Sequence, residues 1–133
     1  MNSPKKGLTI VCFYYLPAIL WMGLIFYLSS VPGLKTGADS MGLEIFLRKT
    51  AHLFEYFILT LLFWRTIRKQ TKLPFKKVGL ICFSLVIVYA ISDEFHQHFV
   101  VDRAGKVVDV FVDGAGAILG ISFANFLIKN KKH

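Results

Sequence analysis

The chain is poor in charge and lacks the short motifs that mark soluble functional modules. Of its 133 residues only 18% are charged, and 55% are hydrophobic. Its 2 cysteines, Cys12 and Cys82, both lie in apolar runs, where a thiol behaves as a small hydrophobe. This excludes a disulfide framework and a cysteine zinc site. The sequence also contains no phosphate-binding glycine loop, nucleophile elbow or nucleic-acid module, so none of those classes of function is indicated.

Long apolar runs are what the sequence does contain. The mean hydropathy of +0.56 is too high for a soluble domain of this size. We therefore expect a small integral membrane protein with a single domain, residues 1–133, whose partner is the lipid bilayer. The net charge of +8 does not indicate a nucleic-acid partner, because the basic residues cluster in the gaps between apolar runs, as positive-inside topology requires.

Four membrane-spanning helices are predicted, over approximately 8–29, 48–67, 78–97 and 108–128. The first lies in a charge-free stretch that exceeds both the ~20 residues of a crossing helix and the ~7–15 residues of a signal peptide's apolar region. A short interfacial turn is expected at 43–46. The second and third spans have charge-free parts that are too short to cross, so one end of each must be polar. The predicted fold is an all-α four-helix bundle.

The distribution of basic residues predicts the orientation of the bundle. An even number of crossings places both termini on one side of the membrane. That side would carry two Lys in the N-terminal segment, six Lys or Arg at 65–77 and three in the tail, against five on the other side. Because cytoplasmic loops hold the excess of Lys and Arg, both termini are predicted to be cytoplasmic.

Under this topology the polar ends of the last three spans lie at the same, extracytoplasmic face. At roughly 100° per residue, Arg48, His52 and Glu55 form one stripe of the second span, flanked by Lys49. Ionisable groups in spanning helices usually face a bundle interior or a water-filled cavity, so the stripe is a candidate functional site.

The third span ends in a dense polar stretch that would form another wall of the site. Asp93, His96 and Gln97 share a face of the predicted helix, whereas Glu94 points further round, towards a different neighbour or the headgroups. His98 and His133 are expected to face solvent.

The fourth span begins with Asp109 and Asp113, which lie one helical turn apart. Gly116 and Gly120 continue the same stripe. Small residues spaced four apart let helices approach closely in a bilayer, so this face is expected to be packed and the two acids to aim inward.

Three kinds of chemistry would use these groups. A divalent cation, magnesium, manganese or zinc, could bind His52 with Glu55, or a cluster of Asp93, His96, Asp109 and Asp113. A histidine held by a carboxylate could act as general base, which makes the catalytic candidates His52, Glu55, Asp93 and His96. The third possibility is recognition of an anionic headgroup or phosphate. Its ligand-binding candidates are Arg48, Lys49, Glu94, Gln97, Arg103, Asp109 and Asp113. A purely structural interpretation, in which these charges are ion-paired helix ends, stays open.

Three polar segments, 48–56, 92–97 and 102–116, resemble in order and spacing those of the VanZ-like family of small bacterial membrane proteins. That family is named for a glycopeptide-resistance component associated with reduced teicoplanin susceptibility. The turn 100–102 departs from the proline-containing turn expected in many members. The resemblance implies the following polar signature in this chain: Lys49, His52, Glu55, Asp93, Glu94, His96, Gln97, Arg103, Asp109 and Asp113.

Together these observations predict a polar pocket that faces the extracytoplasmic side and binds or acts on an anionic cell-envelope component, such as a lipid-linked headgroup. The resemblance implies an effect on susceptibility to teicoplanin-type glycopeptides. Two alternatives stay open. One is a metal-dependent membrane hydrolase or transferase acting on a lipid-linked substrate, and the other is a membrane scaffold or assembly subunit.

Overall fold

The computed structural model describes residues 4–32, 37, 39–103 and 105–130. All the regular structure in these residues is helical, which confirms the predicted all-α fold. In chain order the elements are α1 (Pro4–Ile10), η1 (Val11–Tyr15), α2 (Leu16–Ser30), α3 (Met41–Gln70), α4 (Phe75–Gln97) and α5 (Val107–Asn130).

The first three elements follow one another without a break, and the π-helical segment η1 precedes Pro17. Proline has no backbone N–H, and its ring clashes with the carbonyl group four residues earlier, here that of Phe13. A wider π turn accommodates such a residue inside a helix. α2 then ends at Ser30, two residues before Pro32, because the residue before a proline is disfavoured in the helical conformation.

α3 begins earlier than the sequence predicted. The separate interfacial turn expected at 43–46 is wrong, since these residues form the start of a helix of 30 residues. Ser40 caps this helix, because its side chain accepts a hydrogen bond of 3.2 Å from the Leu43 N–H. Glu44 adds a negative charge in the first turn, where the helix dipole favours it.

Among the described residues, three helical stretches are long and apolar enough to cross a membrane: Gly7–Ser30, Phe75–Gln97 and Val107–Asn130. They coincide with three of the four predicted spans. α3 is longer than any of them, but it carries Arg48, Lys49 and Glu55 in its first half. The described helices therefore support a membrane protein, and the crossing by α3 stays a prediction.

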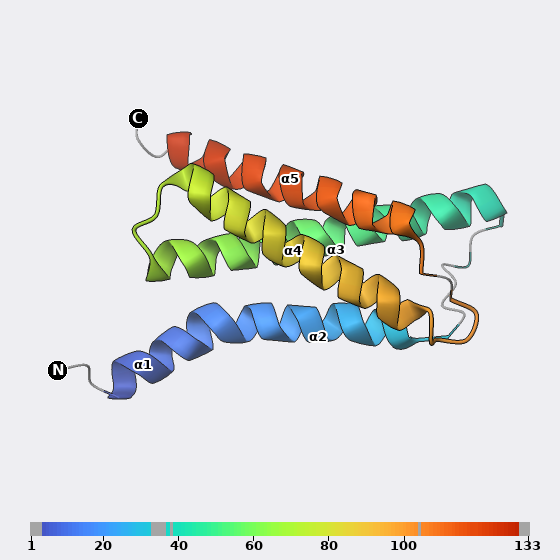
Figure 1. The fold of residues 1–133 in the computed structure, drawn as a ribbon, viewed down its shortest axis with the longest axis horizontal. Helices are drawn as coiled ribbons and strands as arrows, with labels where there is room; N and C mark the ends of the chain where they lie inside the picture. Colours follow the sequence, from blue (N-terminus) through green and yellow to red (C-terminus); the bar gives the residue numbers. More distant parts are fainter. Residues whose placement is uncertain (1–3, 33–36, 38, 104, 131–133) are drawn as a thin grey trace.

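The helices lie side by side in an elongated bundle (Figure 1). α1, the loop 71–74 and the C-terminal end of α5 lie at one end of it. The opposite end holds the C-terminal ends of α2 and α4 and the first turns of α3 and α5. The most extensive helix–helix contact is between α3 and α5, and α4 packs on both.

Two glycines set the close approach of α5 to α3. A Cβ atom at Gly116 would overlap the backbone carbonyl oxygen of Leu53, and one at Gly120 would lie 2.9 Å from Cβ of Thr60. The glycine stripe of the fourth predicted span is therefore the packed face, as the spacing predicted.

Candidate functional site

Charged and amide side chains are buried at the end of the bundle that holds the C-terminal end of α4 and the first turns of α5. Asp93, Glu94, Gln97 and Asp113 are each at most 5% exposed. Burying ionisable groups is costly unless they find partners, so their arrangement must serve either the fold or a ligand.

One hydrogen-bonded group ties α4 to α2. Asp93 Oδ2 accepts hydrogen bonds from Ser29 Oγ at 2.8 Å and from Gln97 Nε2 at 3.0 Å. The same Gln97 nitrogen donates to Glu94 Oε1 at 3.2 Å. Gln97 thus holds two carboxylates of neighbouring residues together, since an amide nitrogen has two donors to share.

Glu94 shares Gln97 with Asp93 but also has a neighbour of its own, as predicted, and the alternative that it faces the headgroups is wrong. Its Oε2 accepts a hydrogen bond of 2.8 Å from the backbone N–H of Lys106, and the residue is 5% exposed. The physical reason is the close return of the chain over α4. A Cβ atom at Gly105 would overlap the backbone carbonyl oxygen of Glu94, so this turn fits only because residue 105 has no side chain.

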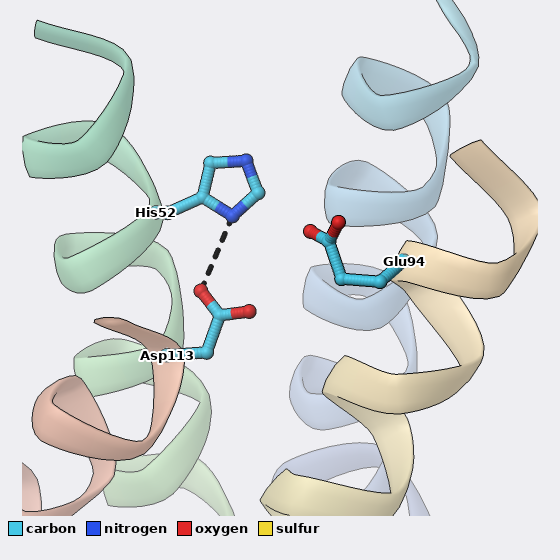
Figure 2. Close-up of side chains that lie close together, drawn as sticks. All are labelled: His52, Glu94 and Asp113. Atoms are coloured by element: carbon cyan, nitrogen blue, oxygen red, sulfur yellow. Dashed lines mark hydrogen bonds and ion pairs between the residues drawn. The ribbon is translucent and has the colours of Figure 1, made fainter. Parts of the chain in front are cut away.

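His52 and Asp113 join α3 to α5 beside Glu94. His52 Nδ1 and Asp113 Oδ1 lie 3.2 Å apart, and Asp113 is fully buried. Figure 2 shows the Glu94 side chain extending from α4 towards this pair. One ligand atom from each of the three residues lies within 4.8 Å of the others, which is a geometry that could hold a divalent cation. Imidazole and carboxylate donors suit zinc or manganese. Of these three residues, His52 and Asp113 are metal-ligand candidates predicted from the sequence, whereas Glu94 is not.

Two arginines line a small cavity next to this group. The cavity has a volume of about 170 Å³ and is lined by Leu28, Ser29, Arg48, Ala51, His52, Glu55 and Arg103. Arg48, His52 and Glu55, the stripe predicted on the second span, therefore all line the same cavity. Neither guanidinium forms an ion pair with a carboxylate within the described part of the chain.

The turn after α4 aims Arg103 at the end of α2. Asp102 adopts a left-handed conformation with φ 59°, and the Arg103 N–H donates to the Val100 carbonyl at 3.1 Å. The Arg103 side chain then donates to the carbonyl oxygens of Leu28, at 2.8 Å, and Val31, at 3.2 Å. Burial, followed by the positive charge of nearby Arg48, lowers the pKa of Arg103 from its ordinary value. An anion between these two cations would be stabilised by both.

Lys49 and Asp109 form an ion pair at the rim of the site. Lys49 Nζ lies 2.8 Å from Asp109 Oδ1, with the lysine side chain 38% exposed. Such a half-exposed pair contributes only about 0.2–1 kcal/mol to stability. It nevertheless fixes the first turn of α5 against α3.

His96 lies on the α2 side of α4, apart from the His52 group. Its Nε2 is 2.9 Å from Ser30 Oγ, and its ring stacks on Phe26 with centroids 4.3 Å apart. His98 is exposed, as expected. His133 lies outside the described residues.

The site also contains every buried side-chain atom that lacks a hydrogen-bond partner in the described chain. These atoms are Arg48 Nε, Asp93 Oδ1, Asp113 Oδ2 and the Oη of Tyr56, whose ring stacks on that of His52. Buried polar groups are normally satisfied, so a concentration of unpartnered ones in one place favours a ligand-binding role over a purely structural one.

The sequence reasoning missed the contribution of the first apolar span. The sequence predicts a site built from the second, third and fourth spans, whereas Ser29, Ser30 and the carbonyls of Leu28 and Val31 bring α2 into it. The available signal was the pair of serines that ends an otherwise apolar run.

The long apolar helices, with polar side chains buried together at one end of the bundle, define the class as a small helical membrane protein. The family model described as VanZ/LLP1 matches residues 13–128, which is most of the chain, so the chain belongs to this family. The resemblance seen in the polar segments is thereby confirmed. Comparison with curated proteins and with solved structures gave no match.

Proposed function

We propose that the polar cavity binds the anionic group of a cell-envelope component, most simply the phosphate of a lipid-linked headgroup. The observation that carries this proposal is the pair of arginines. Among the described residues, Arg48 and Arg103 line one cavity without forming an ion pair, and the Nε of Arg48 is buried with no hydrogen-bond partner. Arginine presents planar donors that match a phosphate group in bidentate geometry.

The surrounding groups fit this role. A cavity of about 170 Å³ accommodates a headgroup moiety but not a whole lipid, so the rest of such a ligand would lie outside it. Glu55 lies in the cavity wall beside the arginines, where a carboxylate can accept hydrogen bonds from sugar or glycerol hydroxyls. Lys49, Gln97 and Asp109 would support the wall rather than touch the phosphate.

The proposal includes the membrane topology. Four crossings, with α3 among them, place both termini in the cytoplasm and the cavity at the extracytoplasmic face of the bacterial membrane. The excess of Lys and Arg at the opposite end supports this orientation. A cavity at that face would meet envelope precursors where glycopeptides act, and through them would lower susceptibility to teicoplanin-type compounds.

Cysteine labelling tests the topology. In a Cys12→Ser background, Val101→Cys in the exposed turn after α4 is expected to react in intact cells with a membrane-impermeant maleimide. Lys72→Cys, in the exposed loop between α3 and α4, is expected to react only after permeabilisation. The reverse pattern would place the cavity on the cytoplasmic side and overturn an extracytoplasmic role.

Anion binding is tested with pyrophosphate as probe on the purified full chain. We expect Arg48→Gln and Arg103→Gln each to weaken binding about 10-fold or more, because a hydrogen bond to a charged group contributes about 1.5–3 kcal/mol. Titration calorimetry at constant salt measures the change. The matched control is Arg65→Gln, whose guanidinium stacks on Tyr14 far along α3. Equal losses in all three variants would reduce the effect to general electrostatics and defeat the proposal.

A second candidate is a metal-dependent hydrolase or transferase acting on a lipid-linked substrate. The observation that favours it is the group formed by His52, Glu94 and Asp113. A bound divalent cation would polarise a phosphoryl or carbonyl oxygen. In this candidate His52 would be a metal ligand, Glu55 and Asp93 would keep the catalytic roles predicted for them, and His96 would lie apart from the metal, beside Ser30. In a scaffold role these charged groups would only hold the helices together. Replacing His52 or Glu55 would then reduce the yield of folded protein without removing a specific activity.

A further inference from the structure

A second and much larger cavity lies at the other end of the bundle. It is a groove of about 840 Å³ between α4 and α5. Its walls are mainly apolar and include Phe75, Gly79 and Phe83 of α4 and Ile118, Ile121 and Ile128 of α5. Lys76, at the start of α4, and Lys129, at the end of α5, also line it. We name this feature the lysine groove. The ends of the two helices that carry the lysines lie together, away from the polar site (Figure 1).

We propose that the lysine groove binds an anionic phospholipid, with an acyl chain along the apolar walls and the phosphate between Lys76 and Lys129. The charge of the lining supports this occupant, because its charged residues are both lysines. A lysine ammonium is a compact cation that binds phosphate as a point charge. The two lysines lie at helix ends, where the headgroups of a bilayer would be.

The length of the groove fits one leaflet. At 1.5 Å per residue, the wall that α5 supplies from Ile118 to Lys129 is about 16 Å long. That is about half of the ~30 Å hydrocarbon thickness of a bilayer. A lipid whose phosphate contacts the lysines would therefore lay its chain along the whole apolar wall.

The charges of the chain make a second copy of it a less suitable occupant of the lysine groove than an anionic phospholipid. The sequence has no acidic residue in 56–92 or in 114–133. A neighbouring copy in the same orientation would therefore bring no acidic side chain to the depth of Lys76 and Lys129. Its own lysines would instead add repulsion there.

The test uses the full chain reconstituted in nanodiscs of equal parts phosphatidylglycerol and phosphatidylcholine. Native mass spectrometry after release from the discs measures which lipid stays bound. We expect the wild type to retain phosphatidylglycerol several-fold over phosphatidylcholine, and the double variant Lys76→Gln, Lys129→Gln to lose the preference. Lys76→Arg with Lys129→Arg should keep it. The matched control is Lys72→Gln with Lys77→Gln, which removes the same charge from exposed lysines outside the groove lining.

A steric variant separates groove binding from surface attraction. Ser122→Trp places an indole in the groove and is expected to reduce retention of both lipids, whereas Phe126→Trp, on an exposed part of α5 outside the lining, should not. An unchanged preference in the Lys76 and Lys129 variant, or an equal loss in its control, would overturn the proposal. If the wild type is a dimer that Ser122→Trp dissociates, and if it shows no lipid preference, the groove binds a second copy of the chain and the lipid proposal is overturned. None of these outcomes depends on the polar cavity, so the proposed function is tested separately.

Discussion

Replacing Asp113 by asparagine is expected to leave the bundle folded and to weaken binding of Mn²⁺ or Zn²⁺ by at least the ~10–100-fold that loss of an outer-shell partner costs. The fully buried side chain keeps its shape, and its amide oxygen can still accept a hydrogen bond from His52. What disappears is the negative charge that a cation needs beside His52 and Glu94. Calorimetric titration of the purified chain, with thermal unfolding in the same detergent, measures both effects.

Two further variants make this result decisive. Asp113→Ala leaves His52 without its hydrogen-bond partner, and an unsatisfied buried polar group costs about 1–3 kcal/mol, so this variant should unfold at a lower temperature than Asp113→Asn. The Asp109→Asn variant should bind metal as tightly as the wild type, because Asp109 lies four residues before Asp113 and is paired with Lys49. If Asp113→Asn binds metal as tightly as the wild type, or if the wild type binds none, the metal-dependent candidate fails. The arginine cavity would then stand alone as the basis of function.

The contrast between Asp93 and Glu94 shows how far helical periodicity predicts a site. The 100° rule separated the two neighbours only in part, since Asp93 bonds to Ser29 of α2 and Glu94 to the backbone of Lys106, but both accept a hydrogen bond from Gln97. It could not show that Glu94 would be buried. That depends on the close approach of Gly105 and Lys106 to Glu94, which is possible because residue 105 has no side chain, and no local pattern encodes this contact.

The helix packing was more accessible to prediction than the site. Apolar run lengths gave three of the helices, and the spacing of Gly116 and Gly120 gave the packed face of α5, because small residues four apart have one dominant use between membrane helices. The contribution of α2 escaped prediction. Serines at a helix end are usually read as caps or loop residues, and only the tertiary contact between Ser29 and Asp93 gives them a place in the site.

Replacing Gly116 by alanine is expected to damage both the fold and the site. Its added Cβ would overlap the Leu53 carbonyl oxygen and lie 3.2 Å from the Phe57 nitrogen, and these are backbone atoms of α3 that cannot rotate away. The helices must then separate, at a cost in the range of about 1–3 kcal/mol or more for overpacking. Because Asp113 lies three residues before Gly116 and His52 one residue before Leu53, the same separation pulls the His52–Asp113 pair apart.

A graded series of glycine-to-alanine variants tests this coupling, since the chemical change is the same at each position. Gly120→Ala should have a smaller effect, because its Cβ would lie 2.9 Å from Thr60 Cβ and 3.0 Å from the Phe57 carbonyl oxygen. Gly23→Ala in α2 should be neutral or stabilising, since nothing lies within 4 Å of its added Cβ and alanine favours the helix. Thermal midpoint and pyrophosphate affinity should therefore fall together, most at residue 116, less at 120 and not at 23. A Gly116→Ala variant that unfolds early but binds pyrophosphate normally would show that the arginine cavity does not depend on the α3–α5 contact, and that α2 and the turn at Arg103 are enough to hold it.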